Sequence, residues 1–311
     1  MDIFLNAAQQ IPEYKKLDKY LNDHNTLPAL VTGVSHIHKA HIIGALLQKP
    51  ELLPVLVIAE SEAESQRLSN DINMMYGAGT ALLYPAKELL LGDFEAASRE
   101  YEHKRIFALS AMLDGTCKAV ICSPEAAAQL TIPPEELKQR TITLSADMEI
   151  SQEDIVKRLL AAGYSRCDLI EGAGQFSVRG GIVDIFDLTE ENPYRIELWG
   201  DEVESIRSFD ILSQRSIEKL ESITVYPATE FVLSEEQIRK GISKLEKEAD
   251  KQEKIFRDAH QPEEAHRIAT QVSELKEQLL EFQSKINLEG YIRYFYENTV
   301  TMPELLSDMA G

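Results

Sequence analysis

Two closely spaced β-hairpins, predicted in the second half of the chain, constrain its fold most strongly. In the run GQFSVRGGIVDIF, Phe176 and Val178 alternate with polar neighbours, which is the two-residue period of a half-buried strand. The Gly180–Gly181 pair follows, and glycines tolerate the positive φ angles of a tight hairpin turn. The run YRIELWGDEVESIRSF repeats this arrangement around a second turn at Gly200. The sequence therefore predicts a small antiparallel sheet, with one polar face that can present side chains to a partner.

The composition is that of a globular protein with an acidic surface. The 311 residues are 44% apolar and carry a formal net charge of −20 at pH 7. Binding to DNA requires positive surface that neutralises phosphates, so we predict a protein as the main partner and little direct DNA binding. No segment approaches the ~18 uninterrupted apolar residues of a membrane span, and the N-terminus does not resemble a signal peptide. Three cysteines at unpatterned spacing are interpreted as free thiols of a cytoplasmic protein: Cys117, Cys122 and Cys167.

Strands and helices alternate in the first part of the chain. Continuous apolar runs predict buried parallel strands at residues 27–31, 55–59, 81–85 and 119–123. Helices are predicted between and after them, at residues 41–48, 62–75, 98–113 and from residue 124. This alternation implies a parallel sheet covered by helices. The predicted fold class is therefore α/β: a degenerate RecA-like (P-loop NTPase-like) domain, with the antiparallel sheet inserted as a second domain.

The segment after the first predicted strand is where a P-loop would lie. A working P-loop has the sequence G-x-x-x-x-G-K-[S/T], in which backbone N–H groups surround phosphate and the hydroxyl holds magnesium. Gly33 and Lys39 keep their places, but His38 replaces the second glycine and Ala40 replaces the hydroxyl residue. His38 adds a Cβ where the backbone must approach phosphate closely, and Ala40 removes a metal ligand. We predict a segment without nucleotide chemistry and a chain without a cofactor, as we would for an ordinary strand-to-helix loop.

Three histidines in the same segment suggest a metal site as an alternative. His36, His38 and His41 have a spacing that can converge on one ion. No Cys, Asp or Glu lies beside them in the sequence to complete a ligand set. We therefore interpret them as solvent-facing histidines of a degenerate loop and predict no metal.

The hairpin region closely resembles the second domain of the excision-repair protein UvrB and of the bacterial transcription-repair coupling factor Mfd. The runs GQFSVRGGIVDIF and YRIELWGDEVESIRSFD carry the resemblance, which extends over nearly the whole chain. In that family this sheet docks UvrA, so the resemblance implies a non-catalytic module that recruits UvrA. The chain has no acidic Walker B motif and no arginine finger. The resemblance implies a longer parent protein: an ATP-dependent DNA translocase that displaces stalled RNA polymerase and contacts duplex DNA through other domains.

One departure favours the coupling factor over UvrB. UvrB inserts a long tyrosine-rich hairpin after the strand that matches residues 81–85 and threads DNA behind it, whereas this chain has only the short connection Ala86–Ala97.

The resemblance and the P-loop-like segment also suggest two rival functions. The missing hairpin and the acidic charge argue against a UvrB-type damaged-DNA binding module. The residues His38 and Ala40 argue against a weak residual nucleotide hydrolase that uses Lys39.

Two arginines are the principal candidates for the docking site. The resemblance implies that Arg166, in a Tyr-x-Arg segment, and Arg179, in the Val-Arg-Gly turn, contact UvrA. The planar guanidinium suits this role because it binds carboxylates bidentately and anchors interfaces. The alternative is that each is a surface arginine paired with Asp168 or Glu171 of its own domain. Phe186 and Phe176 are further candidates, although both are also compatible with core packing.

We predict three parts along the chain. Residues 1–148 form the first part of the RecA-like domain, residues 149–231 form the UvrA-binding domain, and residues 232–311 form a helical hairpin and the return to the first domain. Gly163 is predicted to cap the helix that opens the second domain. A capping box at Ser234 begins two long helices, at residues 235–259 and 263–285, whose charges are interpreted as solvated faces.

Overall fold

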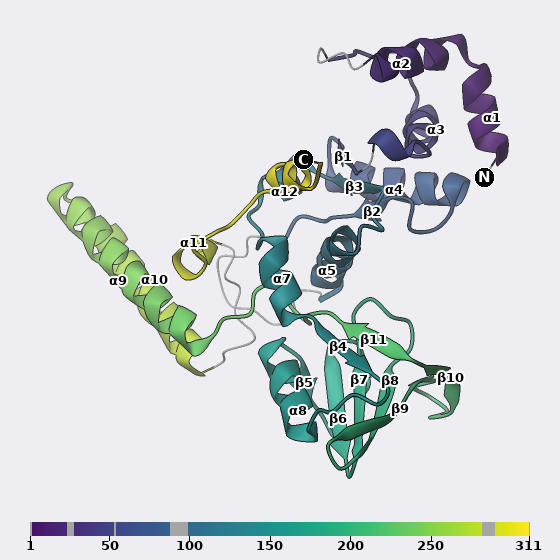
Figure 1. Cartoon of the computed structure of the whole chain (residues 1–311). Helices are drawn as coiled ribbons and strands as arrows, with labels where there is room; N and C mark the ends of the chain where they lie inside the picture. The colour runs from purple at the N-terminus through teal and green to yellow at the C-terminus, as the bar shows by residue number, and fades with distance from the viewer. Residues whose placement is uncertain (1, 24–27, 53, 88–98, 282–289, 311) are drawn as a thin grey trace. The chain divides into compact units, whose positions relative to one another are not determined.

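The computed structural model describes residues 2–23, 28–52, 54–87, 99–281 and 290–310 (Figure 1). The chain divides into two compact units. The first unit comprises residues 1–88, 94–129 and 301–311, and the second comprises residues 89–93 and 130–300. The second unit therefore contains both the antiparallel sheet and the helical hairpin. The finer three-part division stays a prediction.

The first unit contains a three-stranded parallel sheet. Its strands follow the order β1 (Val55–Ile58), β3 (Ala119–Cys122), β2 (Leu82–Leu83), so the later strand β3 lies between the two earlier ones. All four residues of β3 are buried, as expected of a central strand of small and β-branched residues. The parallel pairing confirms the predicted α/β class. The helices of this unit are α1 (Asp2–Gln10), α2 (Pro12–Asn22), α3 (His36–Leu46), α4 (Glu62–Tyr76), α5 (Arg99–Leu113), α6 (Pro124–Ala128) and α12 (Met302–Ala310), with a short 3₁₀ turn at Pro50–Leu52.

Helix α4 illustrates how local sequence determines an element of this unit. Ser61 precedes it and accepts a hydrogen bond from the Glu64 backbone N–H at 3.2 Å, so Ser61 is the N-cap of the helix. Leu68, Ile72 and Tyr76 follow at four-residue spacing, so they share one face of the helix, and all are buried. This face packs against helix α3.

The first predicted strand is wrong. Residues 28–31 form no strand, and Leu30 is 89% exposed. Helix α3 begins at His36 instead of residue 41, so most of the P-loop-like motif is helical. A short apolar run fits a buried strand and other structures equally well, and Pro28 lacks the backbone donor that a central strand needs. Among the described residues the parallel sheet has three strands, so the RecA-like assignment is not confirmed. The Ala86–Ala97 connection lies largely outside the described residues.

The second unit is built on a six-stranded sheet that contains both predicted hairpins (Figure 1). Neighbouring strands are antiparallel except β5 and β6, which are parallel. The sequence predicted the four inner strands but not the two at the edges. In spatial order the strands are β10 (Ser216–Leu220), β9 (Glu202–Phe209), β8 (Tyr194–Trp199), β7 (Ile182–Phe186), β6 (Gln175–Arg179) and β5 (Ser165–Arg166). A separate two-stranded antiparallel ladder joins β4 (Ile142–Ser145) to β11 (Ser222–Val225).

The two hairpin turns lie beside each other and depend on glycine. Gly180 and Gly200 have φ angles of 59° and 63°, a region that residues with a Cβ rarely adopt. Gly181 is needed for another reason, since a Cβ there would lie 2.7 Å from the carbonyl oxygen of Leu198. The Leu198 N–H donates to the Gly181 carbonyl oxygen at 2.8 Å and so joins the two hairpins.

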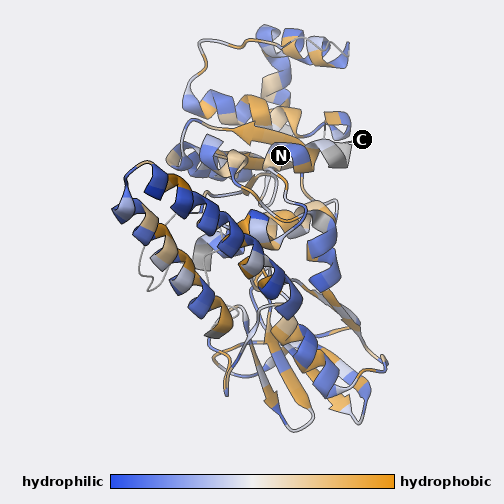
Figure 2. Ribbon diagram, turned by 90° about the vertical axis from the view of Figure 1, so that its left-hand side faces the viewer, coloured by the Kyte–Doolittle hydropathy of each residue, from blue (hydrophilic) through white to orange (hydrophobic). Residues whose placement is uncertain are grey.

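The core of the second unit is formed by one face of this sheet, helix α8 (Gln152–Ala161) and the ladder of β4 and β11. Figure 2 shows the apolar colouring along the strands of the sheet. Helix α8 contributes Ile155 and Leu159, which are completely buried in the same cluster as the strand residues. The helix ends in a Schellman arrangement, in which the Tyr164 N–H donates to the Leu159 carbonyl oxygen at 3.0 Å. Gly163 has a φ of 86° there, which confirms the predicted glycine cap.

A buried carboxylate, Asp187, joins three segments at the end of β7. One carboxylate oxygen accepts hydrogen bonds from the Tyr164 hydroxyl and the Tyr226 backbone N–H, both at 2.8 Å. The other accepts from the backbone N–H and the hydroxyl of Thr189, at 2.8 and 2.6 Å. Asp187 is 0% exposed, and this burial raises its pKa above the ordinary value for aspartate.

The remaining helices of the second unit are α7 (Pro134–Arg140), α9 (Glu235–Asp258), α10 (Pro262–Glu281) and α11 (Ile292–Phe295). Ser234 and Gln237 form both hydrogen bonds of the predicted capping box at the start of α9. Helices α9 and α10 lie side by side, and their outer faces are mostly hydrophilic (Figures 1 and 2). The predicted helix end near Lys285 lies outside the described residues.

Helix α9 packs tightly on α11 at Gly241. A Cβ at this position would lie 2.1 Å from Cδ1 and 2.4 Å from Cε1 of Phe295, whose ring is buried. We therefore expect Gly241→Ala to lower the free energy of unfolding by about 1–3 kcal/mol, because overpacking outweighs the gain in helix propensity. Ser243→Ala, at an exposed position of the same helix, is the control. Equal midpoints for both variants in denaturant unfolding would contradict this close packing.

The three cysteines are free thiols, as predicted. Burial raises the pKa of Cys117 and of Cys122 to about 11, so neither is a thiolate at neutral pH. None of the helices in the described part of the chain combines the length and the apolar character needed to span a membrane.

Candidate protein-docking surface

The pairing register separates the two faces of the six-stranded sheet. Phe176 pairs with Ile185, and both side chains are completely buried in the core. Successive residues of a strand point to opposite faces, so the neighbours of these core residues lie on the other side of the sheet. We call this side the outer face. Its residues on β6 to β9 include Ser177, Arg179, Ile182, Asp184, Phe186, Arg195, Glu197, Trp199, Ser205 and Arg207.

A buried carboxylate organises the centre of the outer face. Asp184 is 2% exposed and accepts two hydrogen bonds from Arg195, from Nε at 2.7 Å and from Nη2 at 2.8 Å. The Arg195 guanidinium also lies over the ring of Phe209, 4.2 Å from its centroid. The hydrogen bonds to Asp184 raise the pKa of Arg195 above its ordinary value. Asp184 and Arg195 are therefore a charge pair with one fixed geometry.

Arg179 is attached to this pair. Its Nη2 donates to Asp184 Oδ2 at 3.0 Å, and its side chain is 50% exposed. A guanidinium has five N–H donors, and the bond to Asp184 uses one of them. The carboxylate thus orients Arg179, while half of the side chain stays exposed. Such an arginine can bind a partner carboxylate without first losing much side-chain freedom.

The structure does not bring all four predicted docking residues together. Arg179 and the half-buried Phe186 are both on the outer face. Arg166 is exposed on the edge strand β5, where it is in register with Phe176 and thus not on the face of Arg179. Phe176 is 0% exposed in the core, so as a contact residue it is a wrong prediction: the alternation of the strand turns it away from Arg179.

Three further residues of the outer face were not predicted from the sequence: Asp184, Arg195 and Arg207. Arg207 forms an ion pair with Glu197 across β8 and β9. A signal for the two arginines is present, because both alternate with apolar residues in the runs YRIEL and ESIRS. The signal for Asp184 is a single charge within the apolar run IVDIF. Its partners come from other strands, so the sequence alone did not reveal them.

The P-loop-like segment of the first unit has an internal carboxylate beside it. Glu64 of α4 lies with Oε1 2.7 Å from Nδ1 of His36 and 4.0 Å from Nζ of Lys39. Arg67 adds a third contact at 3.5 Å. The hydrogen bond with His36 is the largest of several effects that lower the pKa of Glu64. A negative charge of the protein itself therefore already lies near the one cation of the motif.

The other motif residues do not form a phosphate-binding loop. Ala40 is 0% exposed and packs in the core of the first unit, and His38 lies within helix α3. Gly33 has a φ of 73° in an exposed turn.

The three histidines have separate partners: His36 bonds to Glu64, His38 to the Ser35 hydroxyl, and His41 to the Phe4 carbonyl oxygen. In the described residues, no group of three His, Cys, Asp or Glu side chains could hold a metal ion.

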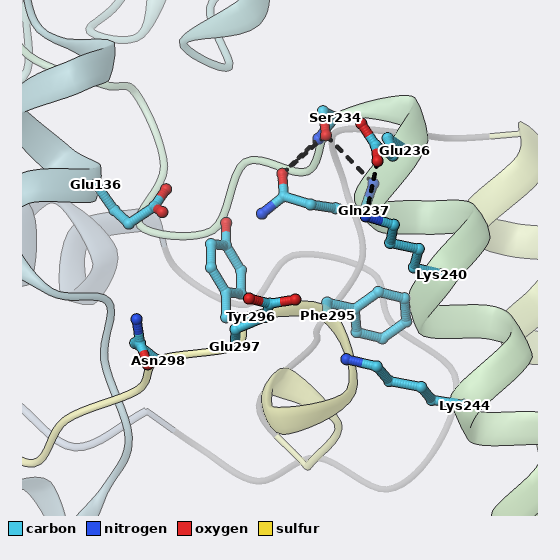
Figure 3. A pocket seen from close by; sticks show the side chains of 10 residues that line it. All are labelled: Glu136, Ser234, Glu236, Gln237, Lys240, Lys244, Phe295, Tyr296, Glu297 and Asn298. Carbon is cyan, nitrogen blue, oxygen red and sulfur yellow. Dashed lines mark hydrogen bonds and ion pairs between the residues drawn. The ribbon is translucent and has the colours of Figure 1, made fainter.

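A cavity of about 310 Å³ lies beside the N-terminal end of α9 (Figure 3). Phe295 and Tyr296 lie between Glu136 on one side and Lys240 and Lys244 on the other. The charges of this lining are partly paired within the protein: Lys240 with Glu236 at 2.7 Å, and Glu136 with Arg140 at 3.4 Å. The mixed charge of this cavity indicates no ligand class.

The six-stranded sheet lies within a segment that matches a known protein family. Residues 142–231, which include the six-stranded sheet, match the family model of the UvrB interaction domain. A transcription-repair-coupling factor of Bacillus subtilis (strain 168) is 32% identical over 309 residues, which cover 99% of this chain and 26% of that protein. The corresponding protein of Staphylococcus haemolyticus (strain JCSC1435) is 30% identical over 244 residues, or 78% of this chain and 20% of that protein.

The chain thus spans about a quarter, or less, of the length of the curated relatives it matches. The resemblance inferred from the hairpin runs is confirmed. Residues 142–231 therefore match the UvrB interaction domain, in a chain that is similar over 99% of its length to part of a transcription-repair-coupling factor.

Proposed function

We propose that this chain is a non-catalytic module that recruits UvrA through the outer face of the six-stranded sheet. The observation that carries the proposal is Arg179, half exposed and oriented by the buried Asp184, within the segment that matches the UvrB interaction domain. Arginine with free donors on a rigid strand is a typical interface anchor. Arg166, on the neighbouring edge strand, would contact UvrA at the rim.

Direct titration of purified UvrA with the 311-residue chain tests this proposal. We expect saturable binding with one site per docking sheet. The affinity is measured by calorimetry, or by binding of UvrA to the chain immobilised on a surface. The chain with a three-residue charge reversal in α9, at Arg239, Lys247 and Lys254, is the control for general electrostatic attraction, because these residues lie outside the sheet. No binding by either chain would contradict the proposal.

The parent protein would supply the other activities. The relatives are transcription-repair-coupling factors, and this chain corresponds to about a quarter of the first of them. We expect the remaining domains to form an ATP-dependent DNA translocase that displaces stalled RNA polymerase in the cytoplasm. The present chain would then bring UvrA to the site where the polymerase stopped. Repair would be coupled to transcription by physical attachment and not by a reaction within this chain.

Residual nucleotide hydrolysis is the rival from the enzyme class, and we expect none. Glu64 lies near Lys39, and Ala40 offers no hydroxyl to magnesium. A ligand that binds only the native state raises its stability by RT ln(1 + [L]/Kd). We expect Mg-ATP to leave the melting temperature unchanged in differential scanning fluorimetry. A saturable increase that disappears in Lys39→Ala would contradict this prediction.

Binding to duplex DNA is the other rival, and we expect it to be undetectable at micromolar concentration and physiological salt. The net charge of −20 repels a polyanion at long range, and scattered lysine contacts are too weak to compensate. Fluorescence anisotropy of labelled duplexes, with and without a lesion, measures this. Tight binding that weakens steeply with added salt would reveal a basic groove and contradict the prediction.

A further inference from the structure

Trp199 is the one tryptophan of the sequence, and it is 80% exposed. It belongs to the strand ladder, since it pairs with Glu202 of β9 next to the turn. The preceding residue, Leu198, is in the core cluster, so alternation places Trp199 on the outer face. A paired strand therefore holds a large aromatic side chain in solvent at a defined position.

This side chain lies at the same end of the outer face as Arg179. Ile182 pairs with Arg179 on one side and with Glu197 on the other, so the three form a row across β6, β7 and β8. Trp199 follows Glu197 by two residues on the same face. The hydrogen bond that joins the two hairpin turns keeps this end of the sheet together.

The combination points to a binding site with two different contacts. An aromatic side chain can bury 150–250 Å² of surface, and tryptophan and arginine are the residues most enriched at interface hot spots. A tryptophan side chain has two rotatable bonds, so it loses little conformational entropy when a partner immobilises it. The N–H donors of Arg179 that do not bond to Asp184 would bind a carboxylate of the partner. The indole ring would fit an apolar pocket of the partner beside that carboxylate.

We propose that Trp199 is the aromatic anchor of the UvrA-docking surface and enters an apolar pocket of UvrA next to the carboxylate that Arg179 binds. This inference rests on the proposed function and adds to it the chemistry of the partner surface. Continuity with the proposed docking face favours UvrA as the occupant over a second copy of this chain, and two copies with a net charge of −20 each repel one another.

The test measures UvrA affinity for three variants of the full 311-residue chain. Trp199→Ala is expected to weaken binding about thirty-fold, as truncation of a hot-spot residue does. Trp199→Phe, which keeps an aromatic ring, is expected to recover most of this loss. Leu212→Ala is the matched control: Leu212 is 91% exposed but follows the opposite end of β9. Because both residues are exposed, the melting temperatures should stay equal.

A second measurement observes the side chain directly. Labelling with 5-fluorotryptophan gives a single ¹⁹F resonance, since the chain has one tryptophan. We expect this resonance to shift and broaden when UvrA is added. The inference would be overturned if Trp199→Ala bound UvrA with unchanged affinity and the resonance of the wild-type chain did not shift. Binding by the wild-type chain would still support the proposed function in that case. Failure of the wild-type chain to bind would overturn both. Self-association that Trp199→Ala abolishes would assign the side chain to a contact between copies and overturn the inference.

Discussion

Replacing Arg179 by glutamate is expected to lower the affinity for UvrA by more than about thirty-fold. Truncation of one interface arginine costs ~2 kcal/mol or more, and a like-charge contact with a partner carboxylate adds to this loss. The domain should remain folded, because Asp184 keeps its two hydrogen bonds to Arg195 and Arg179 is half exposed. Affinity from calorimetry and melting temperature from circular dichroism are measured on the same preparations.

Two further variants separate docking from structural roles. Arg179→Gln removes the charge without placing a new carboxylate beside Asp184, and it should lose most of the affinity as well. Arg239→Glu reverses an exposed arginine on α9, outside the sheet, and should bind UvrA like the wild type. The alternative is that Arg179 has a structural role alone, through its ion pair with Asp184. It predicts the opposite pattern, with a lower melting temperature and unchanged affinity in both Arg179 variants. That pattern would remove Arg179 from the docking site.

Replacing Asp187 by asparagine should lower the free energy of unfolding by about 1–3 kcal/mol. The carboxylate accepts four hydrogen bonds, two at each oxygen. Asparagine offers one oxygen and an NH₂ group. The hydroxyl of Thr189 or of Tyr164 can turn to accept from this NH₂ group, but the backbone N–H beside it, of Thr189 or of Tyr226, would face another donor. Each buried donor without an acceptor costs about 1–3 kcal/mol, which exceeds the desolvation relieved by removing the charge. Asp201→Asn, at an exposed turn position, should change stability by less than about 0.5 kcal/mol. Equal losses would contradict the role of Asp187.

The pH dependence of this difference follows from the raised pKa of Asp187. A carboxyl whose pKa is higher in the native than in the unfolded state binds its proton more readily when folded. Its contribution is therefore fully present below the ordinary aspartate value, about 4, and is lost as the pH rises through the native pKa. The difference in the free energy of unfolding between wild type and Asp187→Asn should therefore become smaller as the pH rises above about 4. A difference that widens would contradict the direction of the shift.

Local features of the fold could be predicted from the sequence because they depend on neighbouring residues. The turn at Gly180 follows from the φ angle that the turn requires, and the cap at Ser234 follows from short-range hydrogen bonds. The two hairpins follow from the alternation of apolar and polar residues. The strand at residues 28–31 was wrong, because a four-residue apolar run does not determine whether the rest of the chain offers it a partner.

The tertiary structure decided which side chains of the sheet are buried and which are exposed. Alternation predicts that Phe176 and Arg179 lie on opposite faces, but only the packed core settles which face is covered. The position of Arg179 depends on its hydrogen bond to Asp184, and Asp184 is in turn held by Arg195. The exposure of Trp199 depends on how the two hairpins pair. These contacts join different strands. The sequence by itself therefore determined the hairpins, their turns and the helix caps, whereas register, burial and charge pairing between strands required the folded chain, because long-range contacts form only when the core closes.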